Sequence, residues 1–391
     1  MVKKKYKLKR NIKGMIVLII LLIIVLLSFI LIRKKGLFLN KINIEKQKKT
    51  QNLISLKMPK YEESSELSMV MVGDCLIHSY VYESAKTGDN TYSFASMFTE
   101  VSPLIANHDL AYYNQETIIG GKSLGLSNYP RFNSPEEIGD DMVDLGFNLV
   151  SLANNHTLDK NEIGVINSVT YWKTKPGVYY TGQAISEEDR TNNIKVYEKN
   201  GIKYAFFSYT TTTNGLLPPA GKEYLTNIYS YDKAKQDIDK VKGKADLIIV
   251  AMHWGEEYTT YPNQNQKNIA QELSDLGVNL IIGNHAHSIQ PVEMINDTLV
   301  FYALGNFISA QDTKDRLTGA LVSLNIKKED SGKITFNNIE ADLIYTYFKG
   351  KGSFKIYPYT MIDDSILYNK DTYYNKYKEV LTRYSDIVKV K

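Results

Sequence analysis

The chain has 391 residues, with 47 Lys and Arg, 43 Asp and Glu, and a formal net charge of +4 that is unevenly divided. Residues 1–60 carry 16 basic side chains and one acidic one, so residues 61–391 carry 31 basic and 42 acidic side chains, a net charge of −11. An acidic body argues against a nucleic acid as partner. The single cysteine, Cys75, excludes an intramolecular disulfide framework.

The first sixty residues predict a membrane anchor. Residues 15–32 are 18 residues that are apolar except for Ser28, and a helix of that length spans about 27 Å, close to one hydrocarbon core. The run is long for a signal peptide, and no cleavage site of small residues follows it. We therefore expect a cytoplasmic basic tail at 1–14, an uncleaved signal anchor at 15–32 and a polar stalk at 33–65. This arrangement places the protein in the cell membrane as a single-pass protein, with the N-terminus cytoplasmic and the C-terminal domain extracellular.

Short apolar segments alternate with helical patterns over residues 66–345 and predict an α/β domain. Five of the expected strands run directly into polar residues; these strands are 67–72, 109–114, 147–152, 245–252 and 278–282. Two of the expected helices are 134–145, with Ser134 as its N-cap, and 265–276, ended by Gly277. Because ligands bind beyond the carboxyl ends of the strands in open α/β sheets, we expect the site at these polar clusters.

The side chains that follow these strands are of the types that bind metal ions. They are Asp74, His78, Glu116, Asn155, His156, Asp159, His253, His285 and His287, which include five of the six histidines. Imidazole, carboxylate and amide groups without a thiolate suit Mn, Fe or Zn. The set is larger than one tetrahedral ion can use, so it predicts two divalent metal ions that share a carboxylate. A single histidine at a strand end is more often structural, but five such ends on one sheet favour a common site.

Six segments also carry a resemblance to a known family. They are GDCLIH, NQET, SLANNHTLD, HWGEEY, LGVNLIIGNHAHSIQP and YALGNFI, between about Leu67 and Ile308. In this order they resemble the poly-γ-glutamate capsule-biosynthesis (CapA-type) family, which belongs to the calcineurin-like metallophosphoesterase superfamily. The resemblance implies a four-layer α/β/β/α sandwich, with two metal ions at the end of the sheets.

The resemblance also implies a role for each candidate residue. One ion would be held by Asp74, His78 and His287. The other would be held by Asn155, His253 and His285. Glu116 would bridge the two ions, and His156, oriented by Asp159, would be the general acid or a phosphate contact. Two features depart from the superfamily: three residues separate Asp74 from His78 where one is usual, and Glu116 replaces an Asp.

Two further features lie outside these segments. Arg131, in the loop before the helix at 134–145, is a candidate for binding an anionic substrate, and an ordinary solvated loop residue is the alternative. Residues 346–391 form a tyrosine-rich C-terminal extension. One face of its last helix is apolar and predicts a packing face, with docking to a membrane-embedded partner as the alternative. This face consists of Tyr373, Tyr377, Val380, Leu381, Tyr384, Ile387 and Val388.

The resemblance implies a membrane-anchored protein that acts in the biosynthesis, export or attachment of poly-γ-glutamate or a related capsule polymer, beside membrane-embedded capsule synthase subunits. In one hypothesis the domain is a metal-dependent hydrolase or transferase. The pair of His156 and Asp159 favours it, because a structural metal site has no use for a proton donor. In the second hypothesis the domain is an accessory, non-catalytic subunit of a polymer synthase. A general surface metal-dependent phosphoesterase is a third.

Overall fold

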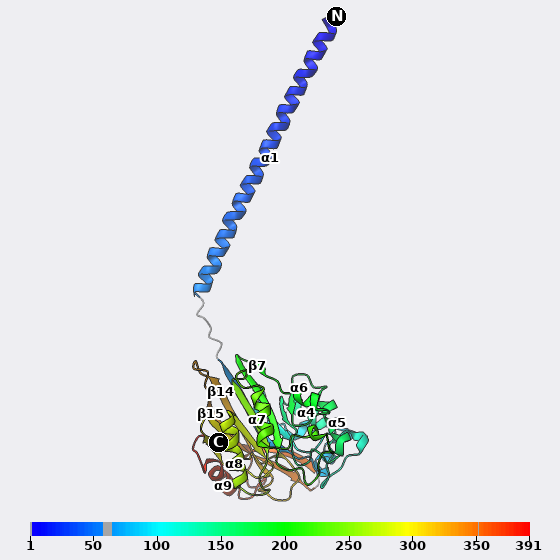
Figure 1. Cartoon of the computed structure of the whole chain (residues 1–391), viewed down its shortest axis with the longest axis vertical. Coiled ribbons are helices and arrows are strands. Elements are labelled where there is room, and N and C mark those ends of the chain that lie inside the picture. Colours follow the sequence, from blue (N-terminus) through cyan, green and yellow to red (C-terminus); the bar gives the residue numbers. More distant parts are fainter. Residues whose placement is uncertain (1, 58–64, 351) are drawn as a thin grey trace. The chain divides into compact units, whose positions relative to one another are not determined.

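The computed structural model describes residues 2–57, 65–350 and 352–391, and the chain divides into two compact units, Met1–Glu63 and Ser64–Lys391. The first unit contains the helix α1 (Val2–Lys57), the long blue ribbon in Figure 1. Its segment Gly14–Thr50 is long and apolar enough to cross a membrane, judged by length and composition, and its apolar side chains are exposed. This helix is consistent with a single-pass membrane anchor. It also includes residues 33–57 of the expected stalk, whose residues 58–64 lie outside the described part.

Within residues 65–350 and 352–391, nine strands form a first sheet. Its parallel half consists of β1 (Glu66–Cys75), β4 (Leu110–Gln115), β5 (Leu149–Ser151) and β6 (Tyr179–Thr181). Its antiparallel half consists of β14 (Thr318–Lys328), β15 (Ile334–Lys349) and β16 (Gly352–Pro358). The strand order is β16-β15-β14-β1-β4-β5-β6. Two short strands, β13 (Asn306–Ile308) and β17 (Lys389–Val390), pair in parallel with β1 and β15.

Six strands of the same described residues form a second sheet. They are β7 (Tyr197–Lys199), β8 (Ile202–Thr210), β9 (Leu247–His253), β10 (Leu280–Asn284), β11 (Val292–Ile295) and β12 (Thr298–Phe301). Their order is β11-β12-β10-β9-β8-β7, in which β8, β9, β10 and β12 are parallel. A separate small hairpin pairs β2 (Lys86–Gly88) with β3 (Thr91–Tyr92).

The two sheets pack face to face, because their strands are apolar on both sides. On β1, Met69 and Met71 enter the core between the sheets, whereas Val70 and Val72 face an outer core. On β9, Ile249 likewise joins the inner core, and its neighbours lie in a second outer core. Successive side chains of a strand point to opposite faces, so a strand covered on both faces reads as a continuous apolar run.

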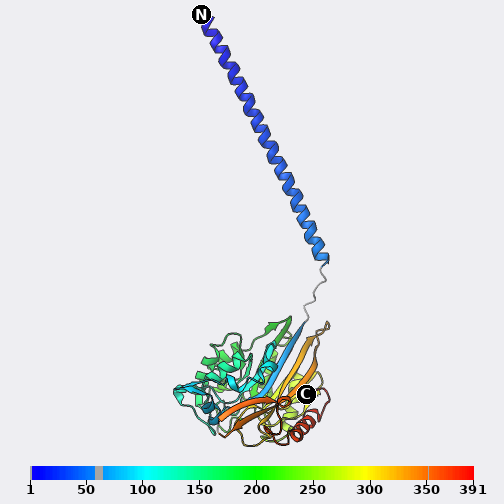
Figure 2. The same ribbon diagram turned by 180° about the vertical axis from the view of Figure 1, so that it is seen from behind.

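Helices cover both outer faces, as Figures 1 and 2 show. The first sheet is covered by α2 (Ser79–Ser84), α3 (Ser102–Ile105), α4 (Glu137–Asp144) and α5 (Asn161–Trp172). The second sheet is covered by α7 (Tyr231–Asp239) and α8 (Gln264–Leu276), and α6 (Glu187–Asn192) has no buried residue. These layers confirm the expected α/β/β/α sandwich.

The ends of two helices test the predicted caps. The N-cap of α4 is Glu136 without a side-chain cap, and the hydroxyl of Ser134 donates to Thr117 Oγ1 at 2.7 Å, so the expected Ser134 cap is wrong. Ser134 is buried, and its hydrogen bond to a neighbouring loop replaces the cap. Gly277 ends α8 in the left-handed conformation, as predicted. Asn263 forms a capping box with Gln266 at the start of α8.

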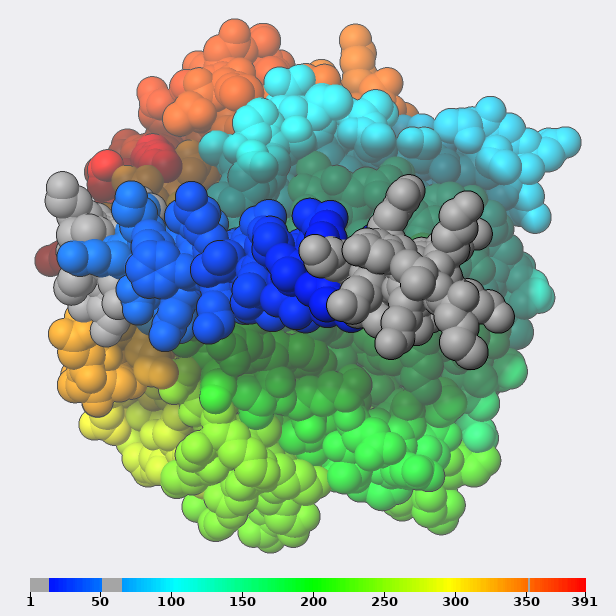
Figure 3. Space-filling view, turned by 90° about the horizontal axis from the view of Figure 1, so that it is seen from above, coloured from blue at the N-terminus to red at the C-terminus, as the bar shows by residue number. Residues whose placement is uncertain are grey.

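The C-terminal residues belong to the same compact unit as the sandwich. Strand β15 runs through the expected boundary at 345, and β16 packs beside the segment around residue 100, where Lys355 forms an ion pair with Glu100 at 2.9 Å. Figure 3 shows these orange C-terminal strands next to the cyan segment. Helix α9 (Lys370–Thr382) buries Tyr377, Val380 and Leu381 in the core between the sheets, which confirms this part of its predicted packing face. The helix ends before Tyr384, whose side chain is exposed, so the placement of Tyr384 on that face is wrong.

Candidate metal centre

The parallel strands of both sheets end at one place, where their polar residues meet. The first sheet contributes Asp74 at the end of β1, Glu116 after β4 and Asn155 after β5. The second sheet contributes His253 at the end of β9, and His285 and His287 after β10. All six side chains are buried. The sequence had suggested five ends of one sheet, whereas the structure divides them between two sheets that face each other.

One cluster joins Asp74, Glu116 and His287. His287 Nδ1 lies 3.4 Å from Asp74 Oδ2, and His287 Nε2 lies 3.6 Å from Glu116 Oε1. The backbone N–H of His285 also donates to Asp74 Oδ2 at 3.1 Å, and the amide of Asn114 donates to Asp74 Oδ1 at 2.8 Å. Asp74 is therefore held in place from both sheets.

A second cluster joins Glu116, His253 and His285. His253 Nε2 lies 3.8 Å from Glu116 Oε1 and 3.0 Å from Asn155 Oδ1. The rings of His253 and His285 have their centroids 4.6 Å apart. Glu116 belongs to both clusters, so its carboxylate stands between two groups of nitrogen and oxygen ligands.

Several of these buried atoms have no hydrogen-bond partner among the described residues. They include both carboxylate oxygens of Glu116 and Nδ1 of His285. A buried carboxylate without partners is costly, and most buried polar atoms in proteins are satisfied. Divalent cations would supply the missing partners, and the imidazole, carboxylate and amide donors suit Mn, Fe or Zn. The residues present therefore fit divalent metal ions.

The shifted pKa values of the site also favour bound metal ions. Burial raises the pKa of the Glu116 carboxyl well above its usual value, and the nearby Asp74 adds to the effect. Burial would lower the pKa of His287, but Glu116 and Asp74 outweigh it and raise that pKa to about 10. Burial lowers the pKa of His253, and it lowers the pKa of His285 to about 4. A positive charge at His287 is therefore stabilised by the carboxylates of Asp74 and Glu116. The imidazoles of His253 and His285 are neutral, so a ring nitrogen of each can bind a metal ion.

His156 and Asp159 lie beside these clusters. His156 Nδ1 lies 2.7 Å from Asp159 Oδ2, which also accepts the backbone N–H of Phe132 at 2.6 Å. The ring of Phe132 packs edge-on against His156, with centroids 4.7 Å apart. The carboxylate and the aromatic ring together determine the orientation of the imidazole, which leaves Nε2 available to a bound molecule.

A cleft of about 520 Å³ opens over the centre. Its lining includes His287, His156, Asp159, His78 and Arg131. Arg131 donates to Asn161 Oδ1 at 2.8 Å at the side of this cleft. A volume of this size is typical of small-molecule and substrate sites.

His78 joins the cleft but neither metal cluster. Its Nδ1 lies 3.2 Å from the backbone N of Ala310 and 3.2 Å from Leu76 O, and its ring packs edge-on against Phe132. Burial lowers the pKa of His78 to about 4. His78 therefore lines the wall of the cleft and belongs to neither group of candidate ligands.

One residue that sequence reasoning did not single out is Asn306. Its Oδ1 lies 2.9 Å from His287 Nδ1, so it orients the ring of that histidine. Asn306 lies within the segment YALGNFI, and its place in that segment was the signal that could have found it. The strand β13 that it begins pairs with β1 at Asp74, which brings the asparagine to the centre.

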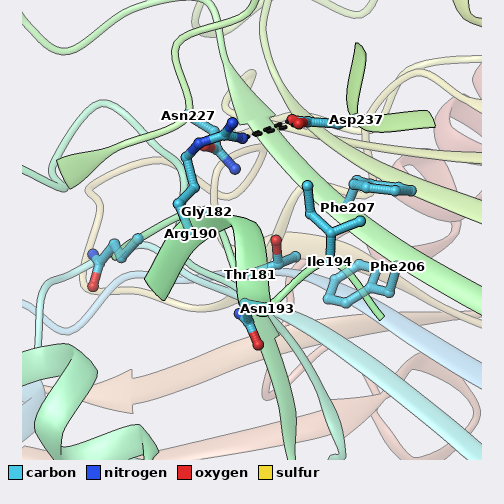
Figure 4. Close-up of a pocket in the computed structure, with 10 residues that line it drawn as sticks. Thr181, Gly182, Arg190, Asn193, Ile194, Phe206, Phe207, Asn227 and Asp237 are labelled. Atoms are coloured by element: carbon cyan, nitrogen blue, oxygen red, sulfur yellow. Dashed lines mark hydrogen bonds and ion pairs between the residues drawn. The ribbon is translucent and has the colours of Figure 1, made fainter. Parts of the chain in front are cut away.

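A second, much smaller cavity lies elsewhere and is drawn in Figure 4. There Arg190 donates to both carboxylate oxygens of Asp237 at 3.0 Å, and Tyr209 donates to the same carboxylate at 3.1 Å. The cavity holds about 10 Å³, room for little more than one water molecule. This buried ion pair joins α6 to α7 and is structural.

The fold and the site define an α/β/β/α protein with a carboxylate and histidine centre at the strand ends. Residues 68–311, more than half of the chain, match the family described as Bacterial capsule synthesis protein PGA_cap, and the chain belongs to this family. It is 26% identical to the PGA biosynthesis protein CapA of Bacillus subtilis (strain 168), over 72% of this chain and 74% of that protein. It is 29% identical to the Capsule biosynthesis protein CapA of Bacillus anthracis, over 68% of this chain and 66% of that protein.

Among solved structures, the chain is similar to the NAD nucleotidase of Haemophilus influenzae, with 13% identity and a TM-score of 0.44. This likeness covers 83% of the present chain and 64% of the nucleotidase.

Proposed function

We propose that this chain is a membrane-anchored, extracytoplasmic protein of poly-γ-glutamate capsule biosynthesis, export or attachment, and that its domain is a metal-dependent hydrolase or transferase. The observation that carries the proposal is the buried carboxylate of Glu116, which belongs to both clusters and has no hydrogen-bond partner among the described residues. Membership of the capsule synthesis family and the names of the two CapA relatives support the polymer as substrate or cargo.

In this proposal Asp74 and His287 would hold one divalent ion, Asn155, His253 and His285 would hold the other, and Glu116 would be shared by both sets of ligands. His78 is the weakest member of the expected set, because it lies in neither cluster. Bound ions of this kind polarise a carbonyl or phosphoryl oxygen and lower the pKa of a bound water.

The chain's own residues would do the rest of the chemistry. His156 would hold a proton at Nε2 and pass it to the leaving group, while Asp159 keeps the other nitrogen protonated and the ring oriented. Arg131, at the side of the cleft, would bind a carboxylate or phosphate of the substrate. Glu257 also lines the cleft, and the body as a whole is acidic. A polyanionic substrate would therefore be repelled except where bound cations and Arg131 offset the negative charge.

The domain boundaries follow from this proposal. A basic tail at 1–14 and a signal anchor at 15–32 would leave the linker 33–65 and the catalytic domain 66–345 outside the membrane. The tyrosine-rich extension 346–391 would complete the domain, since β16, β17 and α9 pack on it. Membrane-embedded synthase subunits would be the partners of such an anchored protein.

The test measures bound Mn, Fe and Zn in the detergent-solubilised full chain, purified without chelators, and then activity. Wild type and His156→Ala are assayed on bis-p-nitrophenyl phosphate and on poly-γ-glutamate, with His108→Ala, outside the site, as the control. About two metals, with activity lost by His156→Ala alone, is the expected result. Two metals with no activity on either substrate would favour the accessory-subunit hypothesis. Preference for the phosphodiester would favour a general phosphoesterase, and no bound metal would overturn the metal centre.

A further inference from the structure

A series of side-chain and backbone contacts connects the C-terminal helix α9 to His287 in the metal centre. The Nδ1 of His287 lies 2.9 Å from Asn306 Oδ1, and its ring stacks on that of Tyr258 with centroids 6.0 Å apart. Asn306 and Tyr258 come from different parts of the chain, after β12 and after β9. The orientation of His287 therefore depends on how these two neighbours are held.

Asn306 is oriented by the loop 309–317. Its amide nitrogen donates to the backbone oxygen of Arg316 at 2.7 Å and to Gln311 Oε1 at 2.9 Å. Because both donors are used on this loop, the amide oxygen is left to face His287. A shift of the loop would turn or displace the group that orients the histidine.

The loop is in turn held by α9. Tyr377 donates its hydroxyl to Asp315 Oδ1 at 2.7 Å, and Lys376 Nζ lies 2.5 Å from the same oxygen. Tyr377 is fully buried, so its hydroxyl holds a well-defined position. Burial opposes ionisation of Asp315, but the hydrogen bonds from Lys376 and Tyr377 outweigh it and lower the pKa of this carboxyl.

Tyr258 is held by a second contact from the same end of the chain. Arg383, which directly follows α9, donates to the backbone oxygen of Thr260 at 2.9 Å, and its guanidinium lies 4.0 Å from the ring centroid of Tyr261. Thr260 and Tyr261 share a loop with Tyr258, whose own N–H donates to Ala286 O at 2.7 Å. The guanidinium of Arg316 also lies 3.6 Å from the Tyr258 ring centroid, so the two loops touch each other.

We infer that Tyr377 and Arg383 are positioning residues of the metal centre, which hold His287 through Asn306 and Tyr258 and so strengthen binding of the ion at Asp74 and His287. The inference rests on the proposed metal centre. Residues 312–391 lie beyond the region that matches the family, so this support comes from a part of the chain that the family match does not cover.

The expected effect is confined to one of the two ions. Groups that orient a metal-binding histidine typically contribute 10–100-fold to metal affinity, and a contact one step further away contributes less. Loss of the Tyr377 hydroxyl removes a hydrogen bond, so we expect about fivefold weaker binding of one ion. In Tyr377→Phe the ion at His253 and His285 should keep its affinity, because Asn306 bonds to the ring of His287 and to neither of these two histidines.

The experiment titrates the metal-free full chain in detergent with Mn²⁺ in a calorimeter and resolves two dissociation constants. Tyr377→Phe and Arg383→Gln are compared with wild type. The matched control is Tyr171→Phe, because Tyr171 donates to Asp140 Oδ1 at 2.8 Å and a lysine, Lys175, pairs with the same carboxylate, far from any loop named above. Thermal unfolding of each metal-free variant reports the purely structural effect.

The expected result is that Tyr377→Phe weakens one constant about fivefold and leaves the other unchanged, that Arg383→Gln weakens the same constant, and that Tyr171→Phe changes neither. In the Asn306→Ala background, Tyr377→Phe should have no further effect, because it acts through Asn306. Two constants in wild type that both variants leave unchanged would overturn the inference and spare the metal centre. Equal weakening of both constants by Tyr377→Phe would show a general loss of stability and would also overturn it. A wild type that binds no Mn²⁺ would overturn the proposed function and this inference together.

Discussion

His285 and His287 both have positive φ angles, 90° and 48°. A residue with a side chain in this region costs about 1–2 kcal/mol, and two such residues separated by Ala286 alone need strong support. The support comes from Asp74, which accepts the N–H of His285, and from Tyr258, which donates its N–H to Ala286. Strain that is held from two sides at the same short segment is typical of a functional site. The backbone here serves to aim the two imidazoles at Glu116.

At the residue scale, Glu116 gives the sharpest prediction. Glu116→Gln keeps the size of the side chain but removes the charge shared by both clusters. We expect bound metal to fall from about two ions per chain to less than one, measured by elemental analysis. Glu257→Gln, a carboxylate in the cleft outside both clusters, is the control and should keep its metal. Full metal content in Glu116→Gln would show that this residue is not the bridge.

At the element scale, two glycines let backbones approach beside the site. A Cβ on Gly73 would lie 1.8 Å from the backbone oxygen of Gly305, and one on Gly283 would lie 1.9 Å from that of Tyr302. Neither oxygen can move freely, since each belongs to a segment paired with the sheets. The close approach at Gly73 brings β13, and with it Asn306, next to Asp74.

Gly73→Ala should therefore destabilise the domain. Forcing a methyl group into a packed backbone contact typically costs 1–3 kcal/mol, and a contact this short places the expected loss at about 3 kcal/mol. Urea unfolding of the full chain in detergent measures it. Gly88→Ala, in the exposed hairpin where the nearest atom is the movable Thr91 Oγ1 at 3.0 Å, should change stability by less than about 0.5 kcal/mol. Equal effects of the two changes would contradict the close-packing argument.

The elements also show which features the sequence could predict. Strands buried on both faces read as apolar runs, so β1, β9 and β10 and the polar residues after them could be predicted locally. The division of those strands between two sheets could not, because it depends on pairing between segments far apart in the chain. The role of Asn306 escaped for the same reason, since its place in YALGNFI marks the segment but does not show which histidine the asparagine orients. Ser134 shows the opposite error, because its local sequence predicts an N-cap that the structure does not have. Its hydroxyl donates a buried hydrogen bond to Thr117 instead.

At the scale of the whole molecule, the apolar segment of α1 is consistent with a single-pass membrane anchor. We expect the full chain to stay in the membrane fraction after alkaline carbonate extraction, because removing its apolar segment from lipid would expose the 17 apolar side chains of residues 15–32 to water. A variant that lacks residues 1–57 should appear in the soluble fraction. Protease added to intact cells should digest the domain but leave a tagged N-terminus protected. Protection of the domain as well would contradict the extracellular orientation.

The metal centre would also join the two halves of the sandwich. Asp74, Glu116 and Asn155 come from the first sheet, and His253, His285 and His287 come from the second, so ions bound by both groups would link the sheets at their open edge. A ligand that binds the folded state alone stabilises it by about 4 kcal/mol at a thousandfold excess over its dissociation constant. In a domain of this size that corresponds to a rise in Tm on the order of 5–10 °C. Scanning calorimetry of the metal-free chain with and without Mn²⁺ should show this rise, and Glu116→Gln should lose most of it. A Tm that Mn²⁺ leaves unchanged would mean that the carboxylates and histidines face each other across the two sheets without a cation between them.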